Sequence, residues 1–510
     1  MLFVAGCAQV REPTGGDQDK VGPKLVDATP QNGSTAFKGD RIVLRFSERV
    51  QVKNARENLV VSPPLAKAPT LRVVGDKSVQ IGLEAPLAAN TTYVFDYAKA
   101  IVDLTEGNQD SSGVFVISTG PVIDQGRLRV HVSEARTGKV LEGFEVLLYP
   151  TDSAADVRQG SSAGFARTMK DGHATVGYLR DGEYRVFALE DKNGNHRYDL
   201  PNERLAFAEQ PALVRADTMS DEVDLRVFTA MDSVQRLLDA RWTNGVFRFA
   251  LSRPAGTLET KRLSGEVLDW EQEWNTARDT VRCWYAGKDS LASGPLLVLA
   301  DGQLLDTAQV EVKSAGTMSV AEVRYTGTTD VLLEFDRPVE VMDSARVEAR
   351  RDSVMVPVRL VKQGARRFRA AHKEAPGGGL KLAFLPGALQ DRQGRTNDTL
   401  RTEVRLAGPK EQGTLHVVLN PQGDYAGPYI LELLDQSGRV MLARAGGTLP
   451  SKVGLSGLPP EPYGLRLVLD ANGNGRWDTG AFGQNRQPER VVVHPAGANV
   501  RAGWEVELVW

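Results

Sequence analysis

The chain of 510 residues contains only two cysteines, Cys7 and Cys283. A fold held together by several disulfides is therefore excluded for this chain, and a bridge between its first residues and a mid-chain strand would be an unusual use of the pair. We expect the two cysteines to have separate roles. Cys283 lies in TVRCWY, on one face of a predicted strand with Val281 and Tyr285, so we predict a small buried hydrophobic residue.

The sequence also has little excess of charge of either sign. Lys and Arg total 62 and Asp and Glu total 65, the net charge is −3, and the two signs are interspersed. No basic stripe is present that could neutralise a phosphate backbone, so we expect no nucleic-acid partner. After the first few residues there is no run of about 20 apolar residues, so we expect no membrane-spanning helix.

Catalytic and nucleotide-binding motifs are absent from the sequence as well. There is no Walker motif, and the histidines are spread singly, without an HExxH pair. They are His131, His173, His196, His372, His416 and His494. GSSAG at residues 160–164 fits the GxSxG pattern with Ser162 as nucleophile, but it lies in a polar loop instead of a strand-to-helix turn. We therefore predict isolated histidines, no catalytic residues and no enzyme activity.

Alternation of apolar and polar side chains dominates the sequence. Ile42, Leu44 and Phe46 share one face of a predicted strand, with Arg41 and Arg45 on the other. Helical periodicity is nearly absent, and its best candidate, around residues 233–241, could equally be a linking strand. The length predicts about four or five domains. We therefore predict an all-β chain of tandem modules.

One corner recurs three times along the chain. LRFSERV at residues 44–50, LEFDRPV at residues 333–339 and FALSRPA at residues 249–255 each run from an alternating strand into a polar, Arg-bearing segment. The first two copies also share a closing loop, with Asp103 and Asp391 in register. The third copy lacks a clear counterpart of this loop, so it is the most divergent module.

A second repeat pairs YRVFALEDKNGNHRYD, residues 184–199, with YGLRLVLDANGNGRWD, residues 463–478. The match is ungapped and places Asp, Asn, Asn and Asp at positions 1, 3, 5 and 9, as in a calcium loop of the EF-hand type, with an arginine backbone carbonyl at position 7. The candidate ligands are Asp191, Asn193, Asn195, Arg197 and Asp199 in the first loop and Asp470, Asn472, Asn474, Arg476 and Asp478 in the second.

Position 12 of these loops carries no acid. Asn202 and Ala481 stand there, so calcium affinity would be weak unless a distant carboxylate contributes. The alternative is that the Asp and Asn side chains accept hydrogen bonds from their own backbone in Asx-turns and shape the loops without metal. Both interpretations are compatible with the residues.

The first module resembles the bacterial Ig-like domain. The resemblance rests on ATPQNGS, RIVLRFSERV, LAANTTYVFDYAKAIVDLTEGN and VFVISTG, which together cover roughly residues 24–120. It implies a sandwich of about seven short strands. GRLRVHVSEARTGKVLEGFEVLLYP from residue 126, followed by TMKDGHATVGYLRDGEYRVFALEDKNGN, resembles the small transthyretin-like or carboxypeptidase-regulatory-like sandwich, and the pattern returns more loosely from residue 413.

These repeats and resemblances predict a tandem array of Ig-like and transthyretin-like β-sandwiches. The predicted order is a signal remnant, lipobox and tether in residues 1–23, an Ig-like domain in 24–121, a transthyretin-like sandwich in 122–229, a divergent Ig-like sandwich in 230–312, an Ig-like domain in 313–408 and a second transthyretin-like sandwich in 409–510.

The opening MLFVAGC resembles the lipobox of bacterial lipoproteins, in which the cysteine is acylated and becomes the new N-terminus. Only six residues precede Cys7, so either the true start codon lies upstream of Met1 or the motif is accidental. The polar segment AQVREPTGGDQDKVGP that follows is typical of a tether. We therefore expect a covalent lipid on Cys7 and anchoring to a membrane.

The order of modules behind this cysteine resembles a family of Ig-like-domain lipoproteins of the Gram-negative outer membrane. The resemblance implies a lipid-anchored protein of that membrane, on either its periplasmic or its extracellular face, and says little about activity. We predict a non-enzymatic binding or scaffold module of the cell envelope, with an outer-membrane protein or a glycan as its partner. The alternatives are an accessory subunit of an outer-membrane export, assembly or uptake complex, and a carbohydrate-active or proteolytic enzyme with an unrecognised site.

Overall fold

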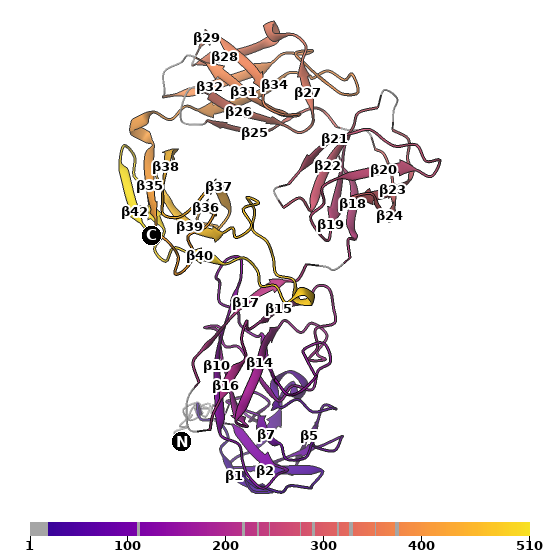
Figure 1. Cartoon of the computed structure of the whole chain (residues 1–510), viewed down its shortest axis with the longest axis vertical. Coiled ribbons are helices and arrows are strands. Elements are labelled where there is room, and N and C mark those ends of the chain that lie inside the picture. The colour runs from indigo at the N-terminus through magenta and orange to yellow at the C-terminus, as the bar shows by residue number, and fades with distance from the viewer. Residues whose placement is uncertain are drawn as a thin grey trace, which may run out of the picture. The chain divides into compact units, whose positions relative to one another are not determined.

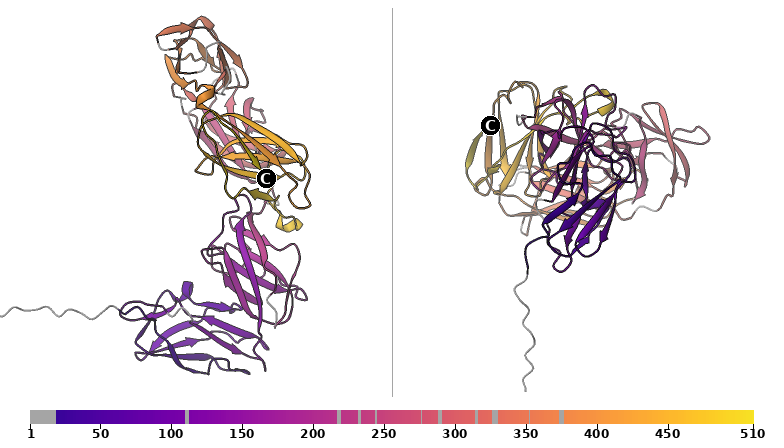
Figure 2. Two further views of the ribbon diagram at one scale, coloured as in Figure 1. Left: turned by 90° about the vertical axis from the view of Figure 1, so that its left-hand side faces the viewer. Right: turned by 90° about the horizontal axis from the view of Figure 1, so that it is seen from below.

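Strands make up nearly all regular structure of the chain (Figures 1 and 2). The only α-helix among the described residues is α1 (Ala55–Asn58), and no helix in this part of the chain is long and apolar enough to cross a bilayer. The predicted all-β class is thus confirmed. The computed structural model describes residues 19–510 apart from gaps at 110–112, 217–219, 232–233, 244, 276, 288–290, 314–315, 326–329, 352 and 373–376.

The chain divides into two compact units. Unit 1 comprises Met1–Glu134 with Lys139–Val227, and unit 2 comprises Ala135–Gly138 with Phe228–Trp510. The buried hydrophobic residues form five clusters, two from unit 1 and three from unit 2. Each cluster is the core of one sandwich. The domain boundaries predicted from the repeats stay predictions.

The first sandwich of unit 1 has the alternation expected from its sequence. Ile42, Leu44 and Phe46 are buried in the core, whereas Arg41 and Arg45 are exposed on the opposite face of the same strand. One sheet has the order β1 (Leu25–Thr29), β2 (Arg41–Phe46), β6 (Ser78–Gly82) and β5 (Thr70–Val74); the other has the order β4 (Val60–Ser62), β7 (Thr92–Asp96) and β9 (Val114–Ser118); and β3 (Val50–Val52) pairs with β8 (Ile101–Asp103).

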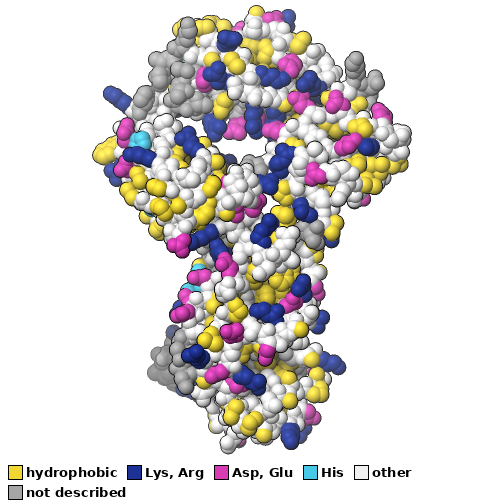
Figure 3. Space-filling view, in the orientation of Figure 1, with side chains coloured by type: hydrophobic (Ala, Val, Ile, Leu, Met, Phe, Trp, Pro, Cys, Tyr) yellow, Lys and Arg dark blue, Asp and Glu magenta, His cyan; other side chains and the backbone are white. Residues whose placement is uncertain are grey.

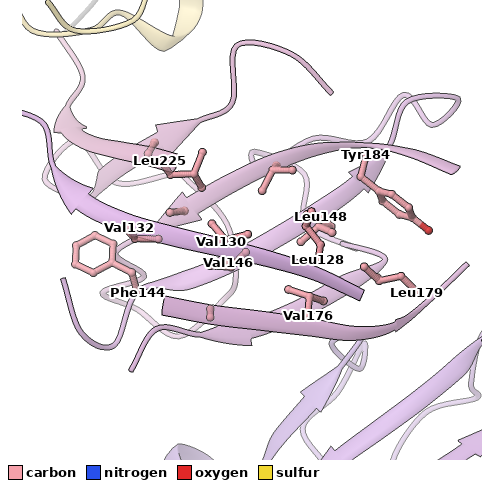
Figure 4. Packing of buried hydrophobic residues seen from close by; sticks show 14 of the residues in the cluster. Leu128, Val130, Val132, Phe144, Val146, Leu148, Val176, Leu179, Tyr184 and Leu225 are labelled. Carbon is pink, nitrogen blue, oxygen red and sulfur yellow. The ribbon is translucent and has the colours of Figure 1, made fainter. Parts of the chain in front are cut away.

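The second sandwich of unit 1 is formed by eight strands in the order β12-β11-β14-β15-β17-β10-β13, with β16 paired to β14. Leu128, Val130 and Val132 lie on one face of β10 and pack with Val146 and Leu148 of β11 in its core (Figure 4). The strands are β10 (Gly126–Glu134), β11 (Glu145–Pro150), β12 (Gly164–Arg167), β13 (His173–Leu179), β14 (Gly182–Leu189), β15 (Arg204–Phe207), β16 (Ala212–Val214) and β17 (Val223–Thr229).

Unit 2 contains two further sandwiches before the last one. In the stretch for which a helix was the alternative, residues 237–241 belong to strand β18, and residue 233 lies outside the described part of the chain. The first of these two sandwiches has β18 (Leu237–Thr243), β19 (Val246–Leu251), β22 (Thr280–Tyr285) and β21 (Trp270–Trp274) in one sheet. Its other sheet contains β20 (Leu258–Arg262), β23 (Gly294–Ala300) and β24 (Gln303–Val310). One sheet of the second sandwich has the order β25 (Val320–Tyr325), β26 (Asp330–Phe335), β31 (Arg367–His372) and β30 (Val358–Lys362). The other sheet has the order β29 (Val354–Val356), β28 (Val347–Arg351), β32 (Gly379–Phe384) and β34 (Leu400–Arg405). A separate pair is formed by β27 (Val339–Val341) and β33 (Leu389–Asp391).

The last sandwich repeats the strand pairing of the second. Strand β35 pairs in parallel with the final strand β42 and antiparallel with β38, as β10 pairs with β17 and β13. Its sheets are β38 (Ser451–Leu458), β35 (Gly413–Leu419) and β42 (Glu505–Val509), and β37 (Val440–Gly446), β36 (Tyr429–Leu434), β39 (Pro462–Leu469) and β40 (Val491–Val493), with β41 (Ala498–Asn499) on β39.

The two aspartates that the sequence placed in register have the same position in the fold. Asp103 pairs with Val50 between β8 and β3, and Asp391 pairs with Val339 between β33 and β27. The Asp103 carboxylate accepts hydrogen bonds from four backbone N–H groups of residues 105–108. These bonds lower the pKa of Asp103 against the opposing effect of burial, which is the largest single cause. The repeated aspartate therefore closes a turn.

Candidate functional site

The two candidate metal loops occupy equivalent places in the second and last sandwiches. The first follows β14 and leads to β15, and the second follows β39 and leads to β40. Each preceding strand begins with a buried tyrosine whose hydroxyl donates to a carbonyl four residues upstream, from Tyr184 to Arg180 at 2.8 Å and from Tyr463 to Pro459 at 3.0 Å. The same strand, with the same tyrosine contact near its start, therefore precedes both loops.

The aspartate at position 1 organises the backbone of each loop. In the first loop, one oxygen of Asp191 accepts from the N–H of Gly194 at 2.8 Å, and the other accepts from the N–H of His196 at 2.8 Å. In the second loop, Asp470 accepts in the same way from Asn474 at 3.0 Å and Gly475 at 2.8 Å. These are the Asx-turn contacts that the sequence offered as the alternative to metal.

The side chains at positions 3, 5 and 9 converge in both loops. The amides of Asn193 and Asn195 donate to the two carboxylate oxygens of Asp199, at 3.0 and 2.6 Å. The amides of Asn472 and Asn474 donate to one oxygen of Asp478, at 2.5 and 2.7 Å. The Asn Oδ1 atoms accept from backbone N–H groups two residues on, including those of Arg197 and Arg476. Three predicted ligand side chains of each loop are therefore brought together, with their Asn Oδ1 atoms bonded to backbone N–H groups.

A glutamate that the sequence analysis missed completes each loop. Glu203 is fully buried, and its carboxylate accepts from the N–H groups of Lys192, Asp199 and Leu200 at 3.1 to 3.2 Å. Glu489 accepts in the same manner from the N–H groups of Ala471 and Asp478, both at 3.0 Å. A carboxylate from outside the ungapped repeat thus contacts each loop, but its oxygens accept backbone hydrogen bonds, and among the described residues neither glutamate belongs to a group of side chains close enough to share a metal ion.

The two glutamates escaped notice because they lie at different distances from the first aspartate. Insertions between loop and strand break the ungapped alignment, so Glu203 and Glu489 do not coincide when the loops are superimposed in sequence. The signal that could have found them is the dipeptide Glu-Arg directly before the next strand, in NERLAF and in PERVVV. Burial, with the negative charges of Asp478 and Asp470, raises the pKa of Glu489.

The first loop carries an additional cluster that contains a histidine. Ligand-capable atoms of Glu145, Asp191 and His196 all lie within 4.8 Å of one another, and His196 Nδ1 is 2.8 Å from Glu145 Oε2. Arg167 also forms an ion pair with Glu145, at 3.1 Å. The buried Glu145 therefore already has two cationic or hydrogen-bonding neighbours, Arg167 and His196.

His196 is the titratable group of this cluster. Burial by itself lowers the pKa of His196, but the hydrogen bond and charge of Glu145 and the charge of Asp191 outweigh it and raise the pKa above its ordinary value. In the second loop Gly475 stands in place of His196, and by strand register Ile430 stands in place of Glu145. The histidine cluster is thus a feature of the first loop alone, and the calcium prediction for both loops stays a prediction.

The prediction of isolated histidines is wrong for one pair. His131 of β10 lies directly opposite His173 of β13, and their ring centroids are 4.8 Å apart. The two positions are far apart in sequence, and only the antiparallel register of these strands brings them together. His131 Nδ1 lies 2.9 Å from Asp224, and His173 Nε2 lies 3.3 Å from Glu222.

The remaining candidates have simpler environments. Cys283 is buried on β22, and burial raises the pKa of its thiol, so the prediction of a buried hydrophobic residue is confirmed. The Ser162 hydroxyl is buried and has no hydrogen-bond partner among the described residues, which leaves no base to activate it there. Cys7, the predicted lipidation site, lies outside the described residues.

Residues 19–119 match the family model of the bacterial Ig-like domain. The first sandwich of this multidomain chain is therefore a bacterial Ig-like domain. Comparison with curated proteins finds no relative that matches the sequence.

Several solved structures are similar to the chain only distantly. They include the Bacillus anthracis TIE protein, at 11% identity over 98% of this chain and 75% of that chain with a TM-score of 0.15. The major pilin subunit BcpA of Bacillus cereus matches at 10% identity over 76% of this chain and 99% of that chain, with a TM-score of 0.14. The S-layer protein SbsC matches at 14% identity over 94% and 68%, with a TM-score of 0.16. At such TM-scores these matches carry no inference.

Proposed function

We propose that the protein is a non-enzymatic, lipid-anchored component of the bacterial outer membrane that acts as a binding or scaffold module of the cell envelope. The observation that carries the proposal is the bacterial Ig-like domain at the start of a series of sandwiches, each with its own hydrophobic core. Such modules present strand edges and loops to partners, as peptide-binding sheets do. The lipobox-like segment ending in Cys7 supports the membrane location.

The surface is consistent with a protein that binds through defined patches. Lys and Arg are interspersed with Asp and Glu over the face shown in Figure 3, which fits the net charge of −3. A mixed surface of this kind favours solubility and disfavours indiscriminate association with nucleic acid or anionic lipid. Specific recognition then depends on local arrangements of side chains.

The test is a pull-down of the full chain from its native membrane in mild detergent, with captured proteins and glycans identified by mass. The proposal predicts a partner of stoichiometric abundance that also resides in the envelope. A protein that fractionates away from membranes, or that hydrolyses peptide or glycan substrates in activity screens, would contradict it.

A further inference from the structure

A groove of about 580 Å³ opens in unit 1 beside the first loop. One wall comes from the first sandwich, through α1 and the segment around β4, and the other comes from β12 and the loop that follows β14. Its apolar lining consists of Leu59, Val61, Pro64, Leu65, Pro69 and Phe165. The volume is in the range of sites that take a small molecule or a few residues of a peptide.

The ionisable side chains that line this groove are all basic. They are Arg56, Arg167, His196 and Arg197, and none of the described lining residues is acidic. Arg56 and Arg197 are exposed, and neither side chain forms a hydrogen bond or an ion pair with the described residues.

The other two basic groups share the counter-ion Glu145, and His196 has Asp191 as a second one at 3.8 Å. Arg167 pairs with the buried Glu145 at 3.1 Å and donates to the carbonyl of Glu57 at 2.8 Å, and His196 bonds the second oxygen of Glu145. Glu145 thus compensates Arg167 and His196 but not the exposed Arg56 and Arg197, so the lining of the groove has an excess of positive charge. In a concave site with apolar walls such a charge attracts anionic groups.

The groove continues past the segment from Pro64 to Ala66 into a second hollow of about 620 Å³. The two share Leu65, His196 and Arg197, and the second adds Arg180 and Asp124 as charged lining residues. A ligand that follows both hollows must be elongated. A single small anion would leave most of this surface uncovered.

Two outer strands lie at the junction of the walls. Strand β4 is at the end of its sheet, and β12 is at the end of the eight-stranded sheet. The N–H of Phe165 in β12 donates to Ser62 Oγ of β4, at 2.9 Å, which holds the two edges next to each other. Outer strands present backbone groups that an extended polypeptide can pair with.

We propose that this groove binds an extended peptide segment in which acidic residues alternate with apolar ones. Alternate side chains of an extended chain point to opposite sides, so one set reaches Arg56 and Arg197 while the other packs on Leu65 and the prolines. Guanidinium groups bind carboxylates through paired hydrogen bonds. A glycan fits the 580 Å³ groove less well, because sugar rings stack on exposed aromatic faces and the aromatic side chain there, Phe165, is buried. The second hollow does have an exposed aromatic residue, Tyr178, so the test includes a sugar probe.

This inference rests on the proposed function, since it names the site and chemistry through which the module would hold an envelope protein. The probe is a fluorescein-labelled peptide of about eight residues with alternating Leu and Glu, titrated with the full chain and followed by fluorescence anisotropy. Wild type is expected to bind it, with affinity falling as salt is raised. The double variant Arg56→Glu/Arg197→Glu is expected to lose at least about tenfold in affinity, which is about 1.4 kcal/mol.

Arg45→Glu is the matched control, because Arg45 is exposed on β2 and lines neither hollow. Both variants should keep the wild-type melting temperature, and Arg45→Glu should keep wild-type affinity. No saturation at about 1 mM protein would overturn the proposal. So would equal losses in the two variants, binding of a Leu-Lys peptide as tightly as the Leu-Glu peptide, or binding of an oligoglucuronate in place of the peptide.

The pull-down separates this inference from the function on which it rests. If wild type and Arg56→Glu/Arg197→Glu capture the same envelope partner equally well, the groove is not the docking site, and the proposed function stands. If the wild-type chain binds the acidic peptide but captures no envelope partner, the groove is a peptide site, and the proposed function fails. Loss of the partner only in the groove variant supports both.

Discussion

The carboxylate of Glu203 connects the first loop to the sandwich beneath it. It is fully buried and accepts three backbone hydrogen bonds, from residues 192, 199 and 200. Glu203→Ala leaves these N–H groups without their acceptor, and unpaired buried donors cost about 1–3 kcal/mol each. We expect a loss of about 3 kcal/mol in the stability of unit 1, read as a lower transition temperature by calorimetry.

Glu209→Ala is the control for this change. Glu209 forms an ion pair with Arg226 at 3.3 Å, but its side chain is 65% exposed, so the pair contributes less than about 1 kcal/mol. All seven tryptophans lie in residues 242–510, so tryptophan fluorescence reports on unit 2 and should keep its midpoint in both variants. A shift for Glu203→Ala no larger than for Glu209→Ala would show that the buried carboxylate does not hold the loop.

His196 makes the stability of unit 1 dependent on pH. Burial lowers the pKa of His196, and the positive charge of Arg167 on β12 lowers it further. The hydrogen bond and negative charge of Glu145 on β11 and the negative charge of Asp191 in the loop outweigh these effects, so the pKa of His196 is raised above its ordinary value. A pKa that is higher in the folded than in the unfolded state stabilises the fold fully below the unfolded pKa, and this stabilisation is lost as pH rises through the folded pKa.

The wild-type transition of unit 1 should therefore fall in temperature as the pH is raised from about 6 through the raised pKa of His196. His196→Gln keeps a polar side chain next to Glu145 but cannot be protonated, so its pH dependence over this interval should be weaker. Calorimetry of both proteins in matched buffers measures the difference. An identical pH dependence in the two would show that His196 does not titrate as the structure implies.

At the scale of the element, each loop is ordered by hydrogen bonds of its own backbone and side chains. Asp470 accepts two backbone N–H groups, and Asp478 accepts the amides of Asn472 and Asn474. If these hydrogen bonds alone order the loop, Asp470→Ala should destabilise the last sandwich by about 1–3 kcal/mol, and the loss should be the same in EDTA as in calcium. Trp477 lies within the loop, directly before Asp478, and provides a local fluorescence signal during unfolding.

The competing interpretation, in which the loop binds calcium, makes a different prediction for the wild type and Asp470→Ala. Calcium that binds only the folded loop raises the melting temperature of wild type with increasing concentration, and EDTA reverses the effect. Asp470→Ala should then lose this response. A calcium-dependent rise in melting temperature in the wild-type protein alone would contradict the interpretation that Asx-turns order the loop without metal. Isothermal titration would then count the ions bound.

Strand faces could be predicted from the sequence because their pattern is local. Each apolar residue in Ile42, Leu44 and Phe46 needs only its neighbours two positions away to be assigned to the core. Asp103 and Asp391 could be placed in register because the repeats share both strand and loop. Contacts that depend on strand pairing could not be predicted in this way. His131 meets His173 only through the antiparallel register of β10 and β13.

The same limit explains the incomplete prediction of the candidate site. The ligands at positions 1 to 9 lie in one ungapped segment, whereas Glu203 and Glu489 reach their loops from beyond insertions of different length. The groove beside the first loop has no sequence signature at all, since Arg56 and Arg197 belong to different sandwiches. Such a site forms only when two modules are folded next to each other.

For the whole molecule, each sandwich has its own core, so function depends on surfaces and on where the chain is held. In the proposed function, the lipobox-like MLFVAGC would place the attachment point at Cys7, ahead of the polar segment that precedes β1. A single acyl chain binds membranes weakly, whereas two or three chains, at about 0.8 kcal/mol per buried CH₂, anchor a protein stably. Anchoring should therefore depend on this one side chain.

Cys7→Ser in the chromosomal copy, with its native upstream sequence, tests this directly. The wild-type protein should incorporate radiolabelled palmitate and sediment with membranes, and the Cys7→Ser protein should do neither. Cys283→Ser is the control, because Cys283 is buried on β22 and should leave both readouts unchanged. A Cys7→Ser protein that still sediments with membranes but takes up no label would be held by a partner instead of a lipid, and the pull-down would then identify that partner.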